Sequence, residues 1–341
     1  MSNAAPRPAA AARPLDKRAP LLAVEGLRIE LPSRGTVTVA ADDVSYEVAA
    51  NETLAVVGES GSGKSMAVRA IMGILPPTAR LTAGAVRFRG VDLLTLPERE
   101  RRKIRGAEIG MVPQNALSAL NPVLTIGRQL AELFEVHRGL SRPSARKRAI
   151  EMLDLVKIPA ARDRVDDYPH QFSGGMRQRA VIAMALALDP DLVIADEPTT
   201  ALDVTVQAQI MRLFAELKQE RRLGLLLITH DMGVVADIAD RVVVMYAGKT
   251  VEDASALEIY ARPAHPYTKA LLRSIPQSAA KGSRLAAIRG APPDLARVPP
   301  GCPFHPRCDY ARDRCRSDVP PAYAVADGHT SRCHYWPEVT E

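Results

Sequence analysis

The most constraining feature of this chain is a glycine-rich loop at residues 58–65, which reads GESGSGKS. The loop fits the pattern G-x-x-x-x-G-K-[ST], which is typical of loops that hold phosphate groups. Glycines let backbone N–H groups turn inward around a phosphate, because no Cβ atom obstructs the approach. The apolar run Thr53–Val57 precedes the loop, and a helical pattern from Lys64 to about Ile74 follows it. A plain Gly/Ser turn would not require this order of strand, loop and helix, so the sequence predicts an α/β fold with a phosphate site.

Individual loop residues have expected parts in that site. The helix that begins near Lys64 adds its positive dipole end to the site. Lys64 is expected to reach the β- and γ-phosphates, and the Ser65 hydroxyl is expected to bind Mg²⁺. The predicted nucleotide-binding residues of the loop are Gly58, Glu59, Ser60, Gly61, Ser62, Gly63, Lys64 and Ser65.

Two further apolar runs end in polar side chains that belong to the same prediction. Asp196 and Glu197 follow the run Leu192–Ala195, which is typical of a buried parallel strand. Asp196 can hold Mg²⁺ directly or through water, and Glu197 can accept a proton from an attacking water. His230 follows the run Leu225–Thr229 in the same way, so we expect it at the same edge of the sheet, close to the γ-phosphate. An acidic pair or a lone His after a strand is weak evidence for a functional site by itself. Together with the phosphate loop, the same residues become strong evidence for one.

Composition excludes several other classes of protein. Of the 341 residues 47% are hydrophobic and 25% are charged, which excludes wholesale disorder and fibrous repeats. The formal net charge is +6, but aromatic residues make up only 4%, which disfavours a nucleic-acid binder that stacks bases. The longest apolar run, 180–188, is well short of the roughly 20 residues that span a bilayer. We therefore expect a soluble, cytosolic chain whose cysteines are reduced or bound to metal.

The pattern of the chain also predicts its organisation. Residues 1–20 lack the apolar core of a secretory signal and are predicted to form a disordered tail. Residues of about 22–30, 36–48 and 84–89 alternate apolar and polar, as half-buried antiparallel strands do. The stretch from about 95 to 188 is mostly helical in pattern. Prolines become dense after about residue 258, which places a boundary near 255–280.

A third motif, residues 171–179, reads QFSGGMRQR and precedes a helical pattern that runs to about Leu188. A helix that starts with Ser-Gly-Gly exposes free backbone N–H groups at its positive dipole end, which suits a second phosphate contact. The alternative is that Ser173 is a simple N-cap, and for an isolated Ser-Gly-Gly this would be the better explanation.

The three motifs together resemble those of the ATP-binding subunits of ABC transporters. Residues 58–65 are similar to the Walker A motif of that family, and residues 192–197 are similar to its Walker B motif with the catalytic glutamate. Residues 172–176 resemble the signature motif, usually L-S-G-G-Q, with Phe and Met substituted at its ends. Three single residues also match the family in order and spacing: Gln114 the Q-loop, Asp203 in Ala201-Leu202-Asp203 the D-loop, and His230 the H-loop. The resemblance covers about residues 22–341.

The resemblance implies a P-loop NTPase fold of the ABC type with three parts. An ABC ATPase domain is expected at 21–255, with an antiparallel β subdomain and a helical signature subdomain at about 95–188. A small cysteine-containing extension is expected at 256–341. The implied catalytic residues are Glu197 as general base, His230 and Gln114, and the implied Mg²⁺ ligands are Ser65, Gln114 and Asp196.

The family also implies how such a subunit works with its partners. ATP is expected to lie in a head-to-tail dimer, between one phosphate loop and the signature motif of a second cassette, which in this subfamily is usually a related but different chain. Two transmembrane permease subunits, and through them an extracytoplasmic solute-binding protein, complete the transporter at the cytoplasmic face of the cell membrane. The residues expected to serve the partner's ATP are Phe172, Ser173, Gly174, Gly175 and Met176, with Asp203 in the D-loop.

Two positions depart from the family pattern. The loop between the early strands, residues 33–40, contains no aromatic residue to stack on adenine, so Val37 or a neighbour would supply only apolar contact. Asn51 stands where a glycine often precedes the Walker A strand, and asparagine tolerates the same turn.

All four cysteines lie in the last forty residues: Cys302, Cys308, Cys315 and Cys333. Their spacing is wider than that of a typical zinc ribbon, yet four thiols in a proline-rich segment suggest a metal that staples it. Four buried or free thiols without a metal are the alternative. Residues 265–272 and 301–308 resemble the C-terminal extension of the oligopeptide/dipeptide importer subfamily, some members of which carry a [4Fe–4S] cluster on four such cysteines. The resemblance therefore implies a structural cluster, with Zn²⁺ as the second choice.

The function that this resemblance implies is ATP hydrolysis that energises import of dipeptides or oligopeptides. The same type of subunit serves nickel complexes, glutathione or another small solute in related transporters, so these remain alternatives. A soluble ABC ATPase acting on nucleic acid is a more remote alternative, because the basic residues near 99–105 alternate with Glu98 and Glu100 as on a solvated helix face. A P-loop kinase would need neither the signature motif nor His230.

Overall fold

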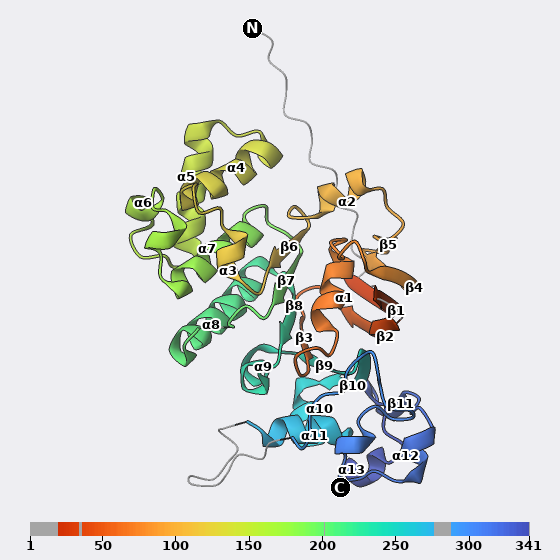
Figure 1. Ribbon diagram of the computed structural model, residues 1–341. Helices are drawn as coiled ribbons and strands as arrows, with labels where there is room; N and C mark the ends of the chain where they lie inside the picture. The colour runs from red at the N-terminus through yellow and green to blue at the C-terminus, as the bar shows by residue number, and fades with distance from the viewer. Residues whose placement is uncertain (1–19, 34–35, 201, 276–287, 341) are drawn as a thin grey trace.

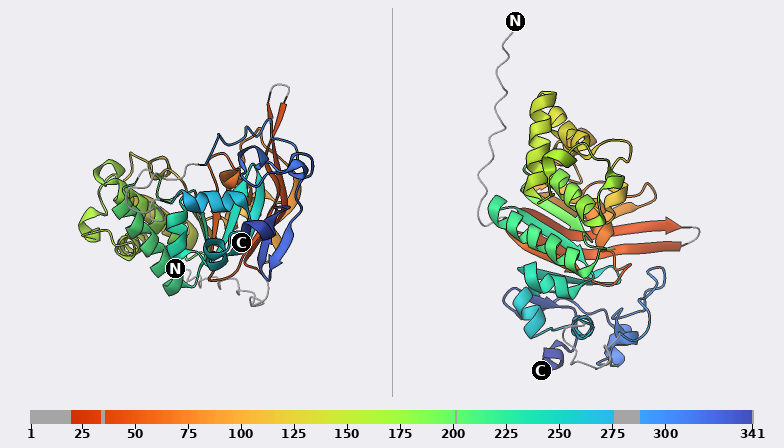
Figure 2. Two further views of the ribbon diagram at one scale, coloured as in Figure 1. Left: turned by 90° about the horizontal axis from the view of Figure 1, so that it is seen from below. Right: turned by 90° about the vertical axis from the view of Figure 1, so that its left-hand side faces the viewer.

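The structure is a computed structural model that describes residues 20–33, 36–200, 202–275 and 288–340. The predicted tail at 1–20 and Ala201 of the predicted D-loop lie outside this part, apart from Pro20. Three regions stack in the molecule, with a helical region at one end, two sheets in the middle and the C-terminal segment at the other end (Figure 1). The second view of Figure 2 shows the same order from the side.

An eight-stranded sheet lies at the centre, with the strand order β11-β12-β10-β9-β3-β8-β7-β6. Strands β9, β3, β8, β7 and β6 are parallel, whereas β10, β12 and β11 join antiparallel. Every residue of β3, β7 and β8 is buried, as expected for strands that are covered on both faces. The bounds are β3 Thr53–Val57, β6 Ile109–Val112, β7 Leu192–Asp196, β8 Gly224–Thr229, β9 Arg241–Tyr246 and β10 Lys249–Ser255.

Helices cover the two faces of this sheet, and alternate strand residues divide between two apolar clusters. Leu192 and Ile194 pack with α1 and the antiparallel sheet, while Val193 and Ala195 pack with α7 and α8. This alternation fixes the register of β7, because a slip by one residue would exchange the two clusters. The helices beside the sheet are α1 Lys64–Ile71, α7 Gly174–Leu186, α8 Val204–Arg221 and α9 Met232–Ile238.

The second sheet is antiparallel and four-stranded, in the order β2-β1-β4-β5. Three of its strands overlap the three alternating segments of the sequence, and in the carboxyl-terminal half of β2, from Val44 to Val48, every second residue is buried. One short strand, β5, was not apparent in the pattern. The bounds are β1 Leu22–Ser33, β2 Thr36–Val48, β4 Arg80–Phe88 and β5 Val91–Asp92.

The region from 95 to 188 is mostly helical, as the pattern predicts, but it also supplies the edge strand β6 of the central sheet. Four apolar or small residues were too short a run to separate from the helical pattern around them. The helices are α2 Glu98–Ile104, α3 Ala116–Ala119, α4 Ile126–Arg138, α5 Arg142–Leu155, α6 Ala161–Arg164 and the 3₁₀ turn η1 Pro169–Gln171.

The C-terminal segment continues the central sheet and does not stand apart from it. Glu252 and Asp253 of β10 pair with Ser331 and Thr330 of β12, so the last strands extend the same hydrogen-bonded ladder. The bounds are α10 Ala256–Ala261, α11 Pro266–Arg273, η3 His305–Arg307, α12 Asp313–Ser317, β11 Tyr323–Ala326, β12 His329–Ser331 and α13 Trp336–Thr340.

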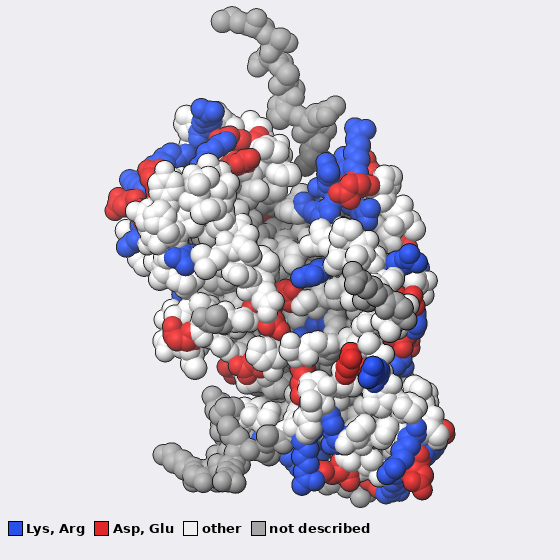
Figure 3. Space-filling model, in the orientation of Figure 1, with Lys and Arg blue, Asp and Glu red and all other residues white. Residues whose placement is uncertain are grey.

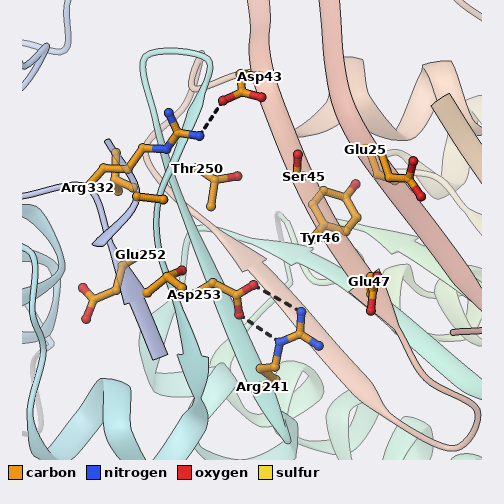
Figure 4. A pocket seen from close by; sticks show the side chains of 14 residues that line it. Glu25, Asp43, Ser45, Tyr46, Glu47, Arg241, Thr250, Glu252, Asp253 and Arg332 are labelled. Carbon is orange, nitrogen blue, oxygen red and sulfur yellow. Dashed lines mark hydrogen bonds and ion pairs between the residues drawn. The ribbon is translucent and has the colours of Figure 1, made fainter. Parts of the chain in front are cut away.

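A cavity of about 390 Å³ lies where the antiparallel sheet, β10 and the C-terminal segment meet (Figure 4). Arg332, beside β12, bonds to Asp43 of β2 at 2.6 Å at one side of this cavity, and Arg241 bonds to Asp253 at 2.8 Å within it. Arginine thus neutralises two of the acidic groups labelled here, Asp43 and Asp253. The Arg332–Asp43 pair ties the C-terminal segment to the antiparallel sheet, whereas the Arg241–Asp253 pair joins β9 to β10 within the central sheet.

Candidate nucleotide site

The predicted site residues leave the central sheet at one edge. The phosphate loop follows β3, Asp196 ends β7, His230 follows β8 and Gln114 lies two residues after β6. These four strands are parallel neighbours, so their carboxyl ends meet at the same edge. This is the edge at which open α/β sheets bind ligands.

Lys64 lies inside the phosphate loop and is 4% exposed. Its ammonium group donates to the carbonyl oxygens of Gly58 and Glu59, at 2.7 and 2.9 Å, and to the Ser62 hydroxyl at 3.3 Å. Burial lowers the pKa of Lys64, and the charges of Glu197, Asp196 and Glu59 oppose that change. A cation held in this way among backbone carbonyls is placed to meet phosphate oxygens.

The loop backbone packs tightly against the strands behind it. Ser62 N–H donates to the Glu59 carbonyl at 3.2 Å, and the Ser62 carbonyl accepts from Gly248 at 3.0 Å. A Cβ atom on Gly58 would lie 2.2 Å from the Met245 carbonyl oxygen, and one on Gly63 would lie 2.1 Å from that of Ala40. Only glycine fits at these two positions.

Two of the three predicted Mg²⁺ ligands, Ser65 and Asp196, lie side by side. The Ser65 hydroxyl donates to the Asp196 carboxylate at 3.0 Å. Burial raises the pKa of Asp196, and the bond from Ser65 opposes this. A hydroxyl and a carboxylate side by side are oxygen ligands of the kind that Mg²⁺ binds.

Glu197 is surrounded by hydrogen-bonding groups. Its carboxylate accepts from the Gln114 side chain at 3.0 Å and from the Thr200 hydroxyl at 3.0 Å, while His230 Nδ1 lies 3.6 Å away. Glu197 has a positive φ of 46°, which is uncommon outside glycine and typical of functional positions. The geometry thus brings Gln114 and His230 to the carboxylate that sequence reasoning made the base. Sequence reasoning did not identify Thr200, whose only signal is its place three residues after the acidic pair.

The signature residues lie at the amino end of α7, apart from the phosphate loop of their own chain. Ser173 is the N-cap of α7 and accepts from Met176 N–H at 3.3 Å, and Phe172 is buried at 2% exposure. Gly174 and Gly175 face Leu202 and Val206 beside the D-loop. Within the described ranges, no hydrogen bond or ion pair joins residues 172–176 to residues 58–65. The first backbone N–H groups of a helix have no intrahelical acceptor, so this end of α7 presents N–H donors.

Two other predicted residues lie at exposed positions. Asp203 is the N-cap of α8 and accepts from Val206 N–H at 2.9 Å. Val37 lies on β2 and is 52% exposed, so it can offer an apolar surface to an adenine ring but nothing to stack on it.

The four cysteines approach one another in the C-terminal segment. They line a single small cavity whose wall also contains three histidines, His265, His305 and His334. Burial raises the pKa of Cys302 to about 11 and those of Cys308 and Cys333 to about 12, and nearby cysteines contribute to each shift. All four thiols are free of disulfides. In the described part of the chain, however, no group of three or more His, Cys, Asp or Glu residues is arranged to hold a metal ion.

Fold and site together define an ATP-binding cassette, in which a phosphate loop and a Walker B strand share a sheet with a separate helical signature region. The family model "ABC transporter" matches residues 41–200, and the model "Oligopeptide/dipeptide transporter, C-terminal region" matches residues 251–315. The chain is 49% identical to the dipeptide transport ATP-binding protein DppD of Bacillus subtilis, over 92% of this chain and 94% of that protein. It is 47% identical to the oligopeptide transport ATP-binding protein OppD of Salmonella typhimurium, over 92% and 93%. The chain therefore belongs to the ATP-binding proteins of ABC transporters, in the branch that carries the oligopeptide/dipeptide transporter C-terminal region.

Solved structures agree with this assignment. The dimeric structure of the ATP-binding cassette MJ0796 in a post-hydrolysis state, bound to ADP and Pi, superposes with a TM-score of 0.62 at 28% identity. It covers 69% of this chain and 98% of that one. CbiO1 of Clostridium perfringens superposes with a TM-score of 0.61 at 26% identity, over 71% and 91%. None of the helices in the described part is long and apolar enough to cross a membrane.

Proposed function

We propose that this chain is the ATP-hydrolysing subunit that energises peptide import by an ABC transporter. The observation that carries the proposal is the convergence of Lys64, Asp196 and Glu197 at one sheet edge, with Gln114 and His230 beside Glu197. Peptides are favoured over other solutes because the chain aligns along nearly its whole length with dipeptide and oligopeptide transport proteins. Nickel complexes and glutathione are the alternative solutes.

In the proposed reaction each residue has a separate task. Lys64 and the loop N–H groups bind the β- and γ-phosphates, and Mg²⁺ held by Ser65, Gln114 and Asp196 would offset the phosphate charge. Glu197 accepts the proton of the attacking water. Gln114 and Thr200 donate to Glu197 and so orient its carboxylate, while His230, 3.6 Å from Glu197, would contact the γ-phosphate.

The proposed assembly places the signature residues on a second cassette. Because Ser173 and Gly175 lie apart from the loop of their own chain, their free N–H groups would serve ATP bound by the partner, which we propose to be a related, different chain. The whole transporter would contain two permeases and an extracytoplasmic solute-binding protein, with this subunit held at the cytoplasmic face of the membrane through the permeases. ATP binding closes the dimer, and hydrolysis reopens it.

The surface charge favours this proposal over nucleic-acid binding. On the face shown in Figure 3, blue Lys and Arg side chains are interspersed with red Asp and Glu side chains. On α2, Arg102 pairs with Glu98 at 3.2 Å and Lys103 pairs with Glu100 at 2.8 Å. Basic groups that are paired in this way are less available to phosphates of a nucleic acid.

Substitution Glu197→Gln tests the chemistry. The amide keeps the size of the side chain but cannot take a proton, so ATP binding is expected to persist while turnover falls by about 10²-fold or more. ATP should then trap a stable cassette dimer, seen by size-exclusion chromatography in the presence of the partner cassette. Glu100→Gln on the surface is the matched control and should hydrolyse ATP normally. Hydrolysis by Glu197→Gln at more than a tenth of the wild-type rate would remove Glu197 from its role as base.

Reconstitution tests the solute and the partners. The subunit should copurify with two permeases encoded beside it, and vesicles containing the complex should take up labelled dipeptide only with ATP. Uptake of nickel or glutathione in place of dipeptide would select one of the alternatives. DNA-stimulated ATPase activity without permeases would contradict the whole proposal.

We propose in addition that the four cysteines bind a [4Fe–4S] cluster with a structural role. Four thiols around one cavity form an all-sulfur donor set of the kind that Fe–S clusters require. The side chains as they lie are not gathered around a metal ion, so the proposal requires their rotamers to adjust when metal binds. Anaerobic purification followed by iron, sulfide and zinc analysis should give about four irons and four sulfides per chain. The purified protein should also show the broad visible absorbance of an iron–sulfur cluster. Zinc without iron would establish the second choice, and the absence of both metals would show that the four cysteines are free thiols.

A further inference from the structure

The second residue of the phosphate loop, Glu59, is bound on all three of its polar groups. Its carbonyl oxygen accepts from Lys64 inside the loop at 2.9 Å. Its backbone N–H donates to the Tyr267 hydroxyl at 2.8 Å. Its carboxylate accepts from both terminal nitrogens of Arg307, at 2.6 and 2.9 Å. Two of the three partners therefore come from the C-terminal segment, more than 200 residues away in the sequence.

Several groups other than Glu59 also fix the position of the Arg307 side chain. Its side chain is only 6% exposed. The guanidinium donates through Nε to the Arg289 carbonyl at 2.8 Å and through Nη1 to the Tyr246 hydroxyl at 3.3 Å. It also lies over the rings of Tyr246 and Phe304, at 5.8 and 5.9 Å from their centroids. A planar, bidentate and nearly buried arginine is the strongest kind of partner for a carboxylate.

Tyr267 is equally fixed. It is fully buried on α11, and its ring packs 4.6 Å from that of Tyr246 and 5.3 Å from that of Phe304. His265, the N-cap of the same helix, accepts from Tyr267 N–H at 3.1 Å. The hydroxyl that meets the Glu59 N–H thus projects from a packed aromatic cluster on to the loop.

We propose that Arg307 and Tyr267 are positioning residues for ATP binding, through which the C-terminal segment holds the phosphate loop in its binding shape. The inference rests on the proposed binding of ATP by residues 58–65. Without the two contacts the loop backbone would have more freedom, and that freedom would have to be lost when ATP binds. Arg307 also neutralises a carboxylate that would otherwise repel the phosphates.

Binding of ATP to the full-length chain with Mg²⁺, measured by calorimetry, tests the proposal through three variants. Arg307→Gln should weaken binding by about tenfold or more, because a buried charge-assisted bidentate bond is lost and Glu59 keeps its unpaired charge. Arg307→Lys should recover part of the affinity, since lysine restores the positive charge but cannot make both hydrogen bonds to the carboxylate. Tyr267→Phe should weaken binding by a few-fold, because one loop N–H loses its acceptor. At saturating ATP the turnover number should change far less than the affinity.

A double-mutant cycle separates positioning from general damage. Adding Glu59→Gln to Arg307→Gln should restore a large part of the affinity, because the unpaired charge is removed, so the two effects should not add. Arg314→Gln, which breaks only an exposed pair with Asp318, is the matched control and should bind ATP as the wild type does.

Amide exchange and the variant Lys64→Ala distinguish failure of the positioning role from failure of the proposed ATP site. Linkage requires that ATP in turn stabilise the segment, so amide exchange in residues 302–310 should slow when ATP is added to wild type but not to Arg307→Gln. Lys64→Ala reports on the loop itself: if it binds ATP normally, the proposed site is wrong. If Lys64→Ala loses binding while Arg307→Gln and Tyr267→Phe keep wild-type affinity, only the positioning role is overturned, whether or not their thermal stability falls.

Discussion

Glycine positions in the phosphate loop differ sharply in what surrounds them. At Gly63 the backbone has a φ of 99°, and an added Cβ would meet the Ala40 carbonyl at 2.1 Å. At Gly61 the φ of 80° is similar, but nothing lies within 4 Å of an added Cβ. The two residues therefore separate the cost of backbone conformation from the cost of a steric clash.

We predict that Gly63→Ala is much more damaging than Gly61→Ala. The exposed change should lower the free energy of unfolding by about 1–2 kcal/mol, the usual cost of a left-handed conformation for an L-residue. The Gly63→Ala change adds a clash with the Ala40 carbonyl, on backbone that cannot move freely, so we expect a loss of about 4 kcal/mol or more. Urea denaturation followed by circular dichroism measures both. Equal losses would show that the loop can shift away from β2.

Sequence motifs were enough to find the residues that converge at the sheet edge, because their spacing follows from loop and strand geometry. Their roles stay predictions. The sequence could not indicate Arg307 or Tyr267 as neighbours of Glu59, because these contacts arise from the packing of segments more than 200 residues apart. Asn51, whose φ is 60°, shows the opposite case, in which a local turn preference was readable from the residue type alone.

At the scale of the element, Asp203 combines two functions that can be separated. Its side chain caps α8 by accepting from Val206 N–H, and its place in the D-loop predicts a contribution to the partner cassette. Asparagine also caps helices well, whereas alanine does not.

We predict that Asp203→Asn keeps the stability of the wild type to within about 0.5 kcal/mol, while Asp203→Ala loses about 1 kcal/mol. If the carboxylate serves the partner, both variants should lower ATPase activity of the cassette dimer by the same factor. Thermal or urea denaturation and steady-state ATPase assays give the two readouts. Full activity of Asp203→Asn would show that Asp203 is only a cap.

Most elements with a regular pattern were predicted and the shortest were not, but β9 was also missed, although its six residues outnumber the five of β3 and of β7. The alternating strands β1, β2 and β4 and the buried strands β3, β7 and β8 all lie where the pattern placed them. Strand β6 was hidden because four residues cannot show a period, and its pairing with β7 depends on tertiary contacts. Strands β11 and β12 were missed for the same reason, in a segment dominated by proline and turns.

At the scale of the whole molecule, the C-terminal segment is joined to the cassette by a buried polar cluster around Glu252. This carboxylate on β10 is 1% exposed and accepts from the backbone N–H groups of Ala264 and His265, at 2.6 and 3.0 Å. Nε2 of His329, on β12, lies 2.9 Å from it and is also buried. One side chain thus links the central sheet, the turn before α11 and the last strand pair.

We predict that Glu252→Ala destabilises the chain by about 3 kcal/mol or more, because it leaves two backbone donors and an imidazole buried without an acceptor. Glu252→Gln should cost less, since one amide oxygen can still accept. Glu100→Ala, which removes an exposed pair with Lys103, is the control and should cost less than about 0.5 kcal/mol. Urea denaturation gives the free energies, and amide exchange shows where the protection is lost.

The residues that lose protection from amide exchange in Glu252→Ala show whether the C-terminal segment and the cassette unfold together. If the C-terminal segment is part of one cooperative unit with the cassette, Glu252→Ala should raise exchange in α11, in β12 and also in the phosphate loop, because Tyr267 lies two residues from His265 and contacts Glu59. If the segment is an independent module, exchange should rise only after residue 255 and ATP affinity should be unchanged. The shared sheet and the Tyr267 contact favour the first result, in which the extension belongs to the structure that binds the nucleotide.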